Sequence, residues 1–104
     1  MLTVKTKDEL TKVLNDNEFV VLKVSAEWCG PCKMMDTVIS QIEPFDGITF
    51  VKVDADESEE DLIEELGIRN LPLFVYYKNG EISNRKVGAI PKQEFIETLQ
   101  ALKD

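Results

Sequence analysis

Two apolar patterns alternate along the chain and predict its secondary structure. Nearly continuous apolar runs, as in residues 18–26 and 48–55, are typical of strands covered on both faces. Between these runs, apolar residues recur at helical spacing, as Leu10, Val13 and Leu14 do. The predicted strands lie in 2–6, 18–26 and 48–55 and in two runs within 71–88, and the predicted helices in 6–17, 32–45, 57–68 and 90–104. The expected order of elements is therefore β-α-β-α-β-α-β-β-α.

Turn residues sharpen this order and indicate the fold class. Asn79-Gly80 between two β runs is the strongest short hairpin signal, so the last two strands are expected to be antiparallel neighbours. Gly67 fits a helix C-cap, and Pro91 lies near the first position of the last predicted helix. Strands joined through helices are expected to be parallel, with right-handed crossovers. The prediction is an α/β fold, with a central mixed sheet flanked by helices on both faces, in a single domain over residues 1–104.

Composition restricts the partners more than the fold. The 104 residues carry a net charge of −8, which repels nucleic acid and anionic membranes. No apolar stretch approaches the roughly 20 residues needed to span a bilayer, and the N-terminus has no signal-peptide pattern. We therefore expect a cytoplasmic, monomeric protein that binds neither nucleic acid nor membrane. The chain also lacks histidine, the usual general base and the commonest metal ligand.

The segment SAEWCGPCK holds both cysteines, Cys29 and Cys32, where a predicted strand ends and a predicted helix begins. Residues three apart in a first helical turn share a face and are close enough to form a disulfide. The helix dipole and the free backbone N–H groups favour the thiolate of Cys29. Pro31 has no N–H to lose there and should stiffen the turn in favour of the dithiol, and Gly30 leaves room for another backbone. Cys29 could then attack a substrate disulfide and Cys32 could release the reduced substrate, with no metal and no bound organic cofactor.

The same cysteine pair admits two other interpretations. Half of a zinc site would need further ligands from carboxylates or from a second chain, because no other cysteine or histidine is present. A purely structural disulfide would close so short a loop that it restricts the unfolded chain little. We therefore favour a redox pair and expect no metal site.

Several separated segments resemble the thioredoxin family, in the order in which the family has them. They are AEWCGPCK at the cysteine turn, FVKVDAD in a central strand, LGIRNLPLFVYYKNGE around a proline, and VGAI before the last helix. The resemblance covers nearly the whole chain and implies a thioredoxin fold. It also implies a thiol–disulfide oxidoreductase that reduces protein disulfides through a reversible couple, with Cys29 as the nucleophile and Cys32 as the resolving cysteine.

The resemblance implies further site residues and partners. Pro72 matches a cis proline that faces the disulfide and leaves the backbone of Leu71 open to an added substrate strand. Trp28, Leu71, Gly88 and Ala89 match the groove that receives the partner. The implied partners are disulfide-containing proteins and a flavin- and NADPH-dependent thioredoxin reductase. The implied redox group is the cysteine disulfide itself, with no bound cofactor.

One position departs from the family in a way that bears on the thiols. Lys23 stands where the family usually has a buried aspartate that is understood to accept the proton of the resolving cysteine. At an effective dielectric of roughly 20, a nearby ammonium group favours a thiolate by about 3 kcal/mol. We expect Lys23 to stabilise the dithiol and make the couple more oxidising, unless it snorkels out or pairs with an acid such as Glu27. Lys52, in the family's usual lysine position, then lacks its aspartate, so at least one of the two ammonium groups should reach solvent or a carboxylate.

Three functions remain distinct at this point. The first is a protein disulfide reductase. The second is a more oxidising protein of the disulfide oxidase or isomerase type, which Lys23 favours. The third is a non-catalytic, thioredoxin-like interaction module with a vestigial thiol pair. Reduction of insulin by dithiothreitol separates catalysis from binding, and the redox potential separates the two directions of catalysis.

Overall fold

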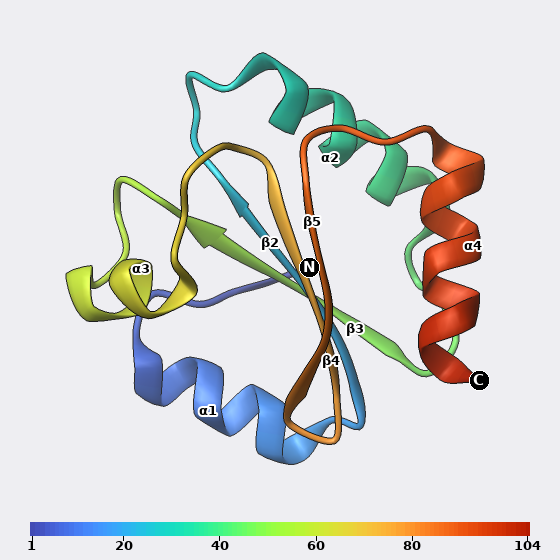
Figure 1. Ribbon diagram of the computed structural model, residues 1–104, viewed down its shortest axis with the longest axis horizontal. Coiled ribbons are helices and arrows are strands. Elements are labelled where there is room, and N and C mark those ends of the chain that lie inside the picture. The colour runs from blue at the N-terminus through green and yellow to red at the C-terminus, as the bar shows by residue number, and fades with distance from the viewer.

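The computed structural model describes residues 1–104 and contains one five-stranded sheet with four helices (Figure 1). In chain order the elements are β1 (Leu2–Thr3), α1 (Lys7–Asp16), β2 (Phe19–Ser25), α2 (Gly30–Ile42), β3 (Ile48–Asp54), α3 (Glu60–Leu66), β4 (Leu73–Lys78), β5 (Glu81–Val87) and α4 (Lys92–Lys103). This is the order that the apolar pattern predicts. The first strand is shorter than expected, because only two of its residues pair with β3.

The sheet is mixed, with strand order β1-β3-β2-β4-β5. β1 and β2 pair with β3 in parallel, whereas β4 pairs with β2 and β5 pairs with β4 in antiparallel fashion. The expectation that every strand pair joined through a helix is parallel is therefore wrong for β3 and β4. α3 has seven residues and spans about 10 Å, whereas a seven-residue strand spans about 23 Å. The chain therefore stays at the end of the sheet where β3 finishes, and β4 runs back from there.

Each face of the sheet has its own core. On one face α1 and α3 cover the sheet, with Leu10, Leu62 and Leu66 packed against apolar side chains of β2, β3 and β4. On the other face α2 and α4 cover it, and Phe95 of α4 packs against Phe74 of β4 with ring centroids 5.3 Å apart. Figure 1 shows the two helix pairs on opposite sides of the strands. The expected arrangement of helices on both faces is confirmed.

Two turns adopt the geometry that their residues predict. Asn79 and Gly80 have φ values of 52° and 81°, so both lie in the left-handed region that the tight hairpin between β4 and β5 requires. Gly67 ends α3 in the same left-handed region, with φ of 63°. The hairpin fixes β5 as the edge strand and so determines where the chain leaves the sheet before α4.

The strand register brings three chain segments to one end of the sheet. Val24 near the end of β2 pairs with Leu73 at the start of β4, and Leu73 also pairs with Val87 at the end of β5. The segment after β2, the segment before β4 and the segment after β5 therefore lie side by side. The first of them carries the cysteines.

Candidate active site

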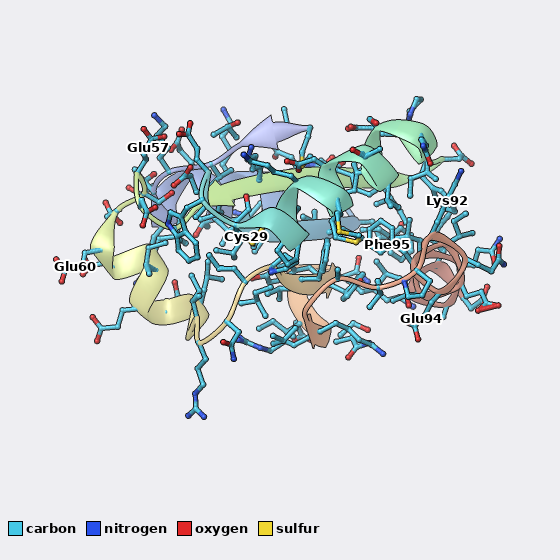
Figure 2. The ribbon with its side chains drawn as sticks, turned by 90° about the horizontal axis from the view of Figure 1, so that it is seen from above. Cys29, Glu57, Glu60, Lys92, Glu94 and Phe95 are labelled. Atoms are coloured by element: carbon cyan, nitrogen blue, oxygen red, sulfur yellow. A yellow bond between two sulfur atoms is a disulfide. The ribbon has the colours of Figure 1, made fainter.

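The two cysteines lie at the junction between β2 and α2. Cys29 is the N-cap of α2, and its Sγ accepts the backbone N–H of Cys32 at 3.2 Å. The two sulfurs form a disulfide, with the Cα atoms 5.3 Å apart. Pro31 lies in the first turn of the helix, where its missing N–H leaves no hydrogen bond unmade. Figure 2 shows Cys29 where the α2 ribbon begins.

Both cysteines are buried, Cys29 slightly less than Cys32. Cys29 is 4% exposed and Cys32 is 1% exposed, and both pack against Ala26 and Leu71. The sulfur of Cys29 faces the unpaired N–H groups of a helix N-terminus, where partial positive charge stabilises a thiolate. The helix N-terminus therefore favours the anionic form of Cys29.

The residues on either side of Cys29 are more open to solvent than the disulfide itself. Trp28 is 72% exposed, so it is not a core residue, and its Nε1 donates a hydrogen bond to Asp56 Oδ2 at 2.8 Å. A Cβ atom at Gly30 would meet no other atom within 4 Å, so the backbone here faces open space. The rim around Cys29 is thus an exposed indole next to an unobstructed turn.

Two further segments border the disulfide. The Leu71–Pro72 peptide bond is cis, as the resemblance implies, and Pro72 is buried. Leu71 packs against the cluster of Ala26, Cys29 and Cys32, while its own backbone N–H and C=O make no hydrogen bond within the chain. The N–H of Gly88 donates to the carbonyl of Pro72 at 2.8 Å, which ties the segment after β5 to the segment before β4. Ala89 follows Gly88 and is exposed.

Lys23 is buried under α2, but it is not unpaired. It is 1% exposed, and its Nζ donates to Oδ1 of Asp36 in an ion pair. The alternative in which Lys23 pairs with an acid is confirmed, but the acid is Asp36 of the helix above the strand and not the example named, Glu27. Burial lowers the pKa of Lys23, the hydrogen bond and charge of Asp36 oppose this effect, and the charge of Lys52 adds to it. The exposed fraction of the Asp36 side chain is 40%, so its carboxylate connects the pair to solvent.

Lys52 pairs with Lys23 across β2 and β3 and is half-buried. The sequence predicts that at least one of the two ammonium groups reaches solvent or a carboxylate. Lys23 does so, because it pairs with Asp36. Lys52 and Asp36 line the same polar cavity of about 350 Å³. The other residues around the cavity are Thr3, Lys5, Ser25, Ala26, Glu27, Lys33, Asp54 and Glu57.

Two acids at this site, Asp36 and Asp56, are not among the site residues predicted from the sequence. The sequence of α2 contains a pattern that could have indicated Asp36. Cys32, Met35 and Ile39 form the buried stripe of α2, and Asp36 follows Cys32 by four residues, so a charged side chain interrupts an apolar stripe. Asp56 had none, because its contact with Trp28 depends on how the segment after β3 folds back toward the cysteine turn.

The rest of the molecule adds no other candidate centre of this kind. No three acidic or cysteine side chains come together as a group that could hold a metal ion. None of the four helices combines the length and apolarity needed to cross a bilayer.

A disulfide of two cysteines three residues apart, at a strand-to-helix junction of a mixed sheet, defines the class of thiol–disulfide oxidoreductases. The family model for thioredoxin matches residues 1–101. A thioredoxin of Mycoplasmoides gallisepticum is 35% identical over 96% of this chain and all of its own length. The solved structure of a mutant thioredoxin from Halobacterium salinarum is 28% identical, covering 99% of this chain and 90% of that one, with a TM-score of 0.91. The Malassezia sympodialis thioredoxin structure is 33% identical, covering 100% of this chain and 91% of that one, with a TM-score of 0.87.

The chain therefore belongs to the thioredoxin family. It is a protein disulfide reductase that uses the Cys29–Cys32 couple.

Burial of Lys23 predicts a stability that depends on pH. Because burial lowers its pKa in the folded state, the unfolded chain holds the Lys23 proton more tightly, and the cost of burying the charge fades as pH rises toward about 10. Replacing Lys23 by Met should raise the free energy of unfolding by about 1–2 kcal/mol at pH 7, since Asp36 can remain hydrated. Urea unfolding at pH 7 and pH 10 should show this gain shrinking at the higher pH.

The matched control for this measurement is Lys12→Met, at an exposed position of α1. It should change stability by no more than about 0.5 kcal/mol at either pH. A Lys23→Met protein that is less stable than the parent at pH 7, or whose advantage grows with pH, would contradict the account.

Proposed function

We propose that Cys29 attacks a disulfide of the substrate protein and forms a mixed disulfide with it. Cys32 then attacks Cys29 Sγ, closes the internal disulfide and releases the reduced substrate. The observation that carries this assignment of roles is the position of Cys29 as the N-cap of α2, where its Sγ accepts the backbone N–H of Cys32. Cys32, one turn into the helix and almost fully buried, reaches only Cys29.

We assign the groove that receives the substrate to the three segments at this end of the sheet. The unpaired backbone groups of Leu71 suit an extended substrate segment that adds as a short strand beside Cys29. Trp28 and Gly30 border that path on the cysteine side, and Pro72 lies within it. Gly88 and Ala89 border the path on the side of β5. This arrangement favours unfolded or exposed segments as substrates.

The same proposal covers the setting in which the protein works. Residues 1–104 act as a single, monomeric domain that carries electrons from a flavin- and NADPH-dependent thioredoxin reductase to disulfide-containing proteins. The cytoplasm is the compartment in which such a dithiol stays reduced. A net charge of −8 and an exposed Trp28 suit brief encounters with many partners.

The buried Lys23 favours a second function, that of a more oxidising carrier. A buried ammonium group on the face of β2 that α2 covers favours the thiolates and hence the dithiol. Its ion pair with Asp36 cancels much of that field, so we propose a smaller effect than for a bare cation. Lys52, which lines the cavity beside the pair, adds to it, and Pro31 restrains the turn in the same direction. We therefore propose a reductase whose redox potential is higher than it would be with aspartate in place of Lys23.

Serine substitutions test the roles of the two cysteines. The parent protein should accelerate reduction of insulin by dithiothreitol, and Cys29→Ser and Cys32→Ser should each abolish the acceleration. Cys32→Ser, but not Cys29→Ser, should accumulate a covalent adduct with insulin that dithiothreitol cleaves, because its mixed disulfide can form but cannot be resolved. Non-reducing electrophoresis measures the adduct.

Other outcomes would assign the protein differently. If the parent did not accelerate the reaction while partner binding survived both serine substitutions, the chain would be an interaction module. If only Cys29→Ser accumulated the adduct, Cys32 would be the nucleophile and Cys29 the resolving cysteine.

A charge substitution tests the effect of Lys23 on the couple. Lys23→Asp removes a cation and adds an anion on the covered face, so the dithiol loses stability and the redox potential falls. We expect a fall of about 20 mV, which corresponds to about 1 kcal/mol for two electrons. Equilibration with glutathione buffers measures the potential, and Lys12→Asp, with the same charge change on exposed α1, should leave it unchanged. A potential for Lys23→Asp that is unchanged or higher refutes the tuning role.

A further inference from the structure

The resolving step needs a proton acceptor that Cys32 cannot find in bulk water. Cys32 must lose its thiol proton before it can attack Cys29, and its side chain is almost fully buried. The chain has no histidine. Lys23, the ionisable group buried beneath α2, carries its proton while it is paired with a carboxylate and cannot take another. With Lys23 protonated in this ion pair, a nearby carboxylate is the acceptor that the charges on this face favour.

Asp36 is the acid that the helix places beside Cys32. It follows Cys32 by four residues on α2, and side chains at that spacing are neighbours, with Cβ atoms about 5–6 Å apart. α2 contains no other acidic residue. A carboxylate at this spacing can take the proton directly or through one water molecule.

The ion pair and the cavity give this carboxylate a fixed position and a route to solvent. The Nζ of Lys23 holds Oδ1 of Asp36 from below, so the side chain is anchored against the sheet. Ala26 packs against both cysteines and also lines the polar cavity that Asp36 faces. Neither cysteine lines this cavity, so Ala26 is the residue that links it to the buried pair, and the partly exposed carboxylate opens it to solvent.

We propose that Asp36, anchored by Lys23, is the carboxylate that accepts the proton of Cys32 during resolution of the mixed disulfide. The inference rests on the proposed function and adds to it a residue from α2. Lys23 acts as a positioning residue, since it works through Asp36.

The step balances in protons and electrons. Asp36 takes the proton from the Cys32 thiol, and the resulting thiolate attacks Cys29 Sγ. The Cys29–Cys32 bond forms as the bond between Cys29 and the substrate sulfur breaks, and the substrate sulfur leaves as a thiolate with the electron pair. The two cysteines are oxidised and the substrate is reduced by two electrons. The proton on Asp36 passes through the open cavity to solvent or to the departing thiolate.

Other charged groups face Asp36 and belong to the same electrostatic environment. They are Lys23 from β2, Glu27 from the cysteine turn, Lys33 from α2, Lys52 and Asp54 from β3, Lys5 after β1 and Glu57 after β3. The three carboxylates in this set lie on turns or at a strand end, and none of them is held by Lys23. The competing acceptor is Lys23 itself in its neutral form, so the experiment must distinguish the two.

The test uses reduced protein and 5,5′-dithiobis(2-nitrobenzoate), which releases one coloured thiolate when Cys29 attacks and a second when Cys32 resolves the adduct. Asp36→Asn keeps an oxygen that can accept from Lys23 but takes up no proton at neutral pH. We expect it to leave the first phase within about twofold and slow the second by roughly 100-fold at pH 7. Its second-phase rate should then rise roughly tenfold per pH unit, while that of the parent rises less steeply. A merely structural role would not change this pH profile.

Three comparisons decide the outcome. Asp46→Asn, at an exposed acid far along the chain, should match the parent in both phases. Lys23→Met, which frees Asp36 without neutralising it, should slow the second phase by less than tenfold. The proposal is overturned if Asp36→Asn resolves within twofold of Asp46→Asn at every pH, or if Lys23→Met is the slower of the two. Absence of the first phase in the parent would instead contradict the proposed function.

Discussion

The hydrogen bond from the backbone N–H of Cys32 to Sγ of Cys29 is the interaction on which the chemistry of this protein depends. It makes a sulfur the N-cap of α2, in a position where oxygen-bearing side chains are usual. At a helix N-terminus, the same N–H groups that need a partner stabilise negative charge. The turn therefore holds Cys29 at the helix N-terminus and Cys32 close enough to form the disulfide.

The sheet brings together the three chain segments that surround the cysteines. Leu73 pairs with both Val24 and Val87, so the cysteine turn, the Leu71–Pro72 segment and the Gly88 segment meet at one end. The antiparallel direction of β4 is essential to this. A parallel β4 would start at the opposite end of the sheet and take Leu71, with its unpaired backbone groups, away from the disulfide.

Local signals predict most of this fold, and pairing direction is the main exception. The apolar runs give the order of elements, Asn79-Gly80 gives the hairpin, and Gly67 gives the end of α3. The direction of β4 depends on the length of α3 relative to the strands, which no single residue encodes. The cysteine pair could be predicted from the sequence for the same reason as the turns, because both cysteines and the start of their helix lie within one short segment. The partner of Lys23 could not, because the pair joins β2 to α2 through a contact that depends on how the helix lies on the sheet.

The central claim is that the start of α2 holds Cys29 as a thiolate at neutral pH while Cys32 stays protected. The most direct measurement is the rate of alkylation of each cysteine in the reduced protein by iodoacetamide across a range of pH, read by mass spectrometry. The account predicts that Cys29 is modified first and reaches half of its maximal rate below about pH 7.5, whereas an unperturbed thiol does so near pH 8.5. Both cysteines reacting slowly until strongly alkaline pH, or Cys32 reacting ahead of Cys29, would contradict it.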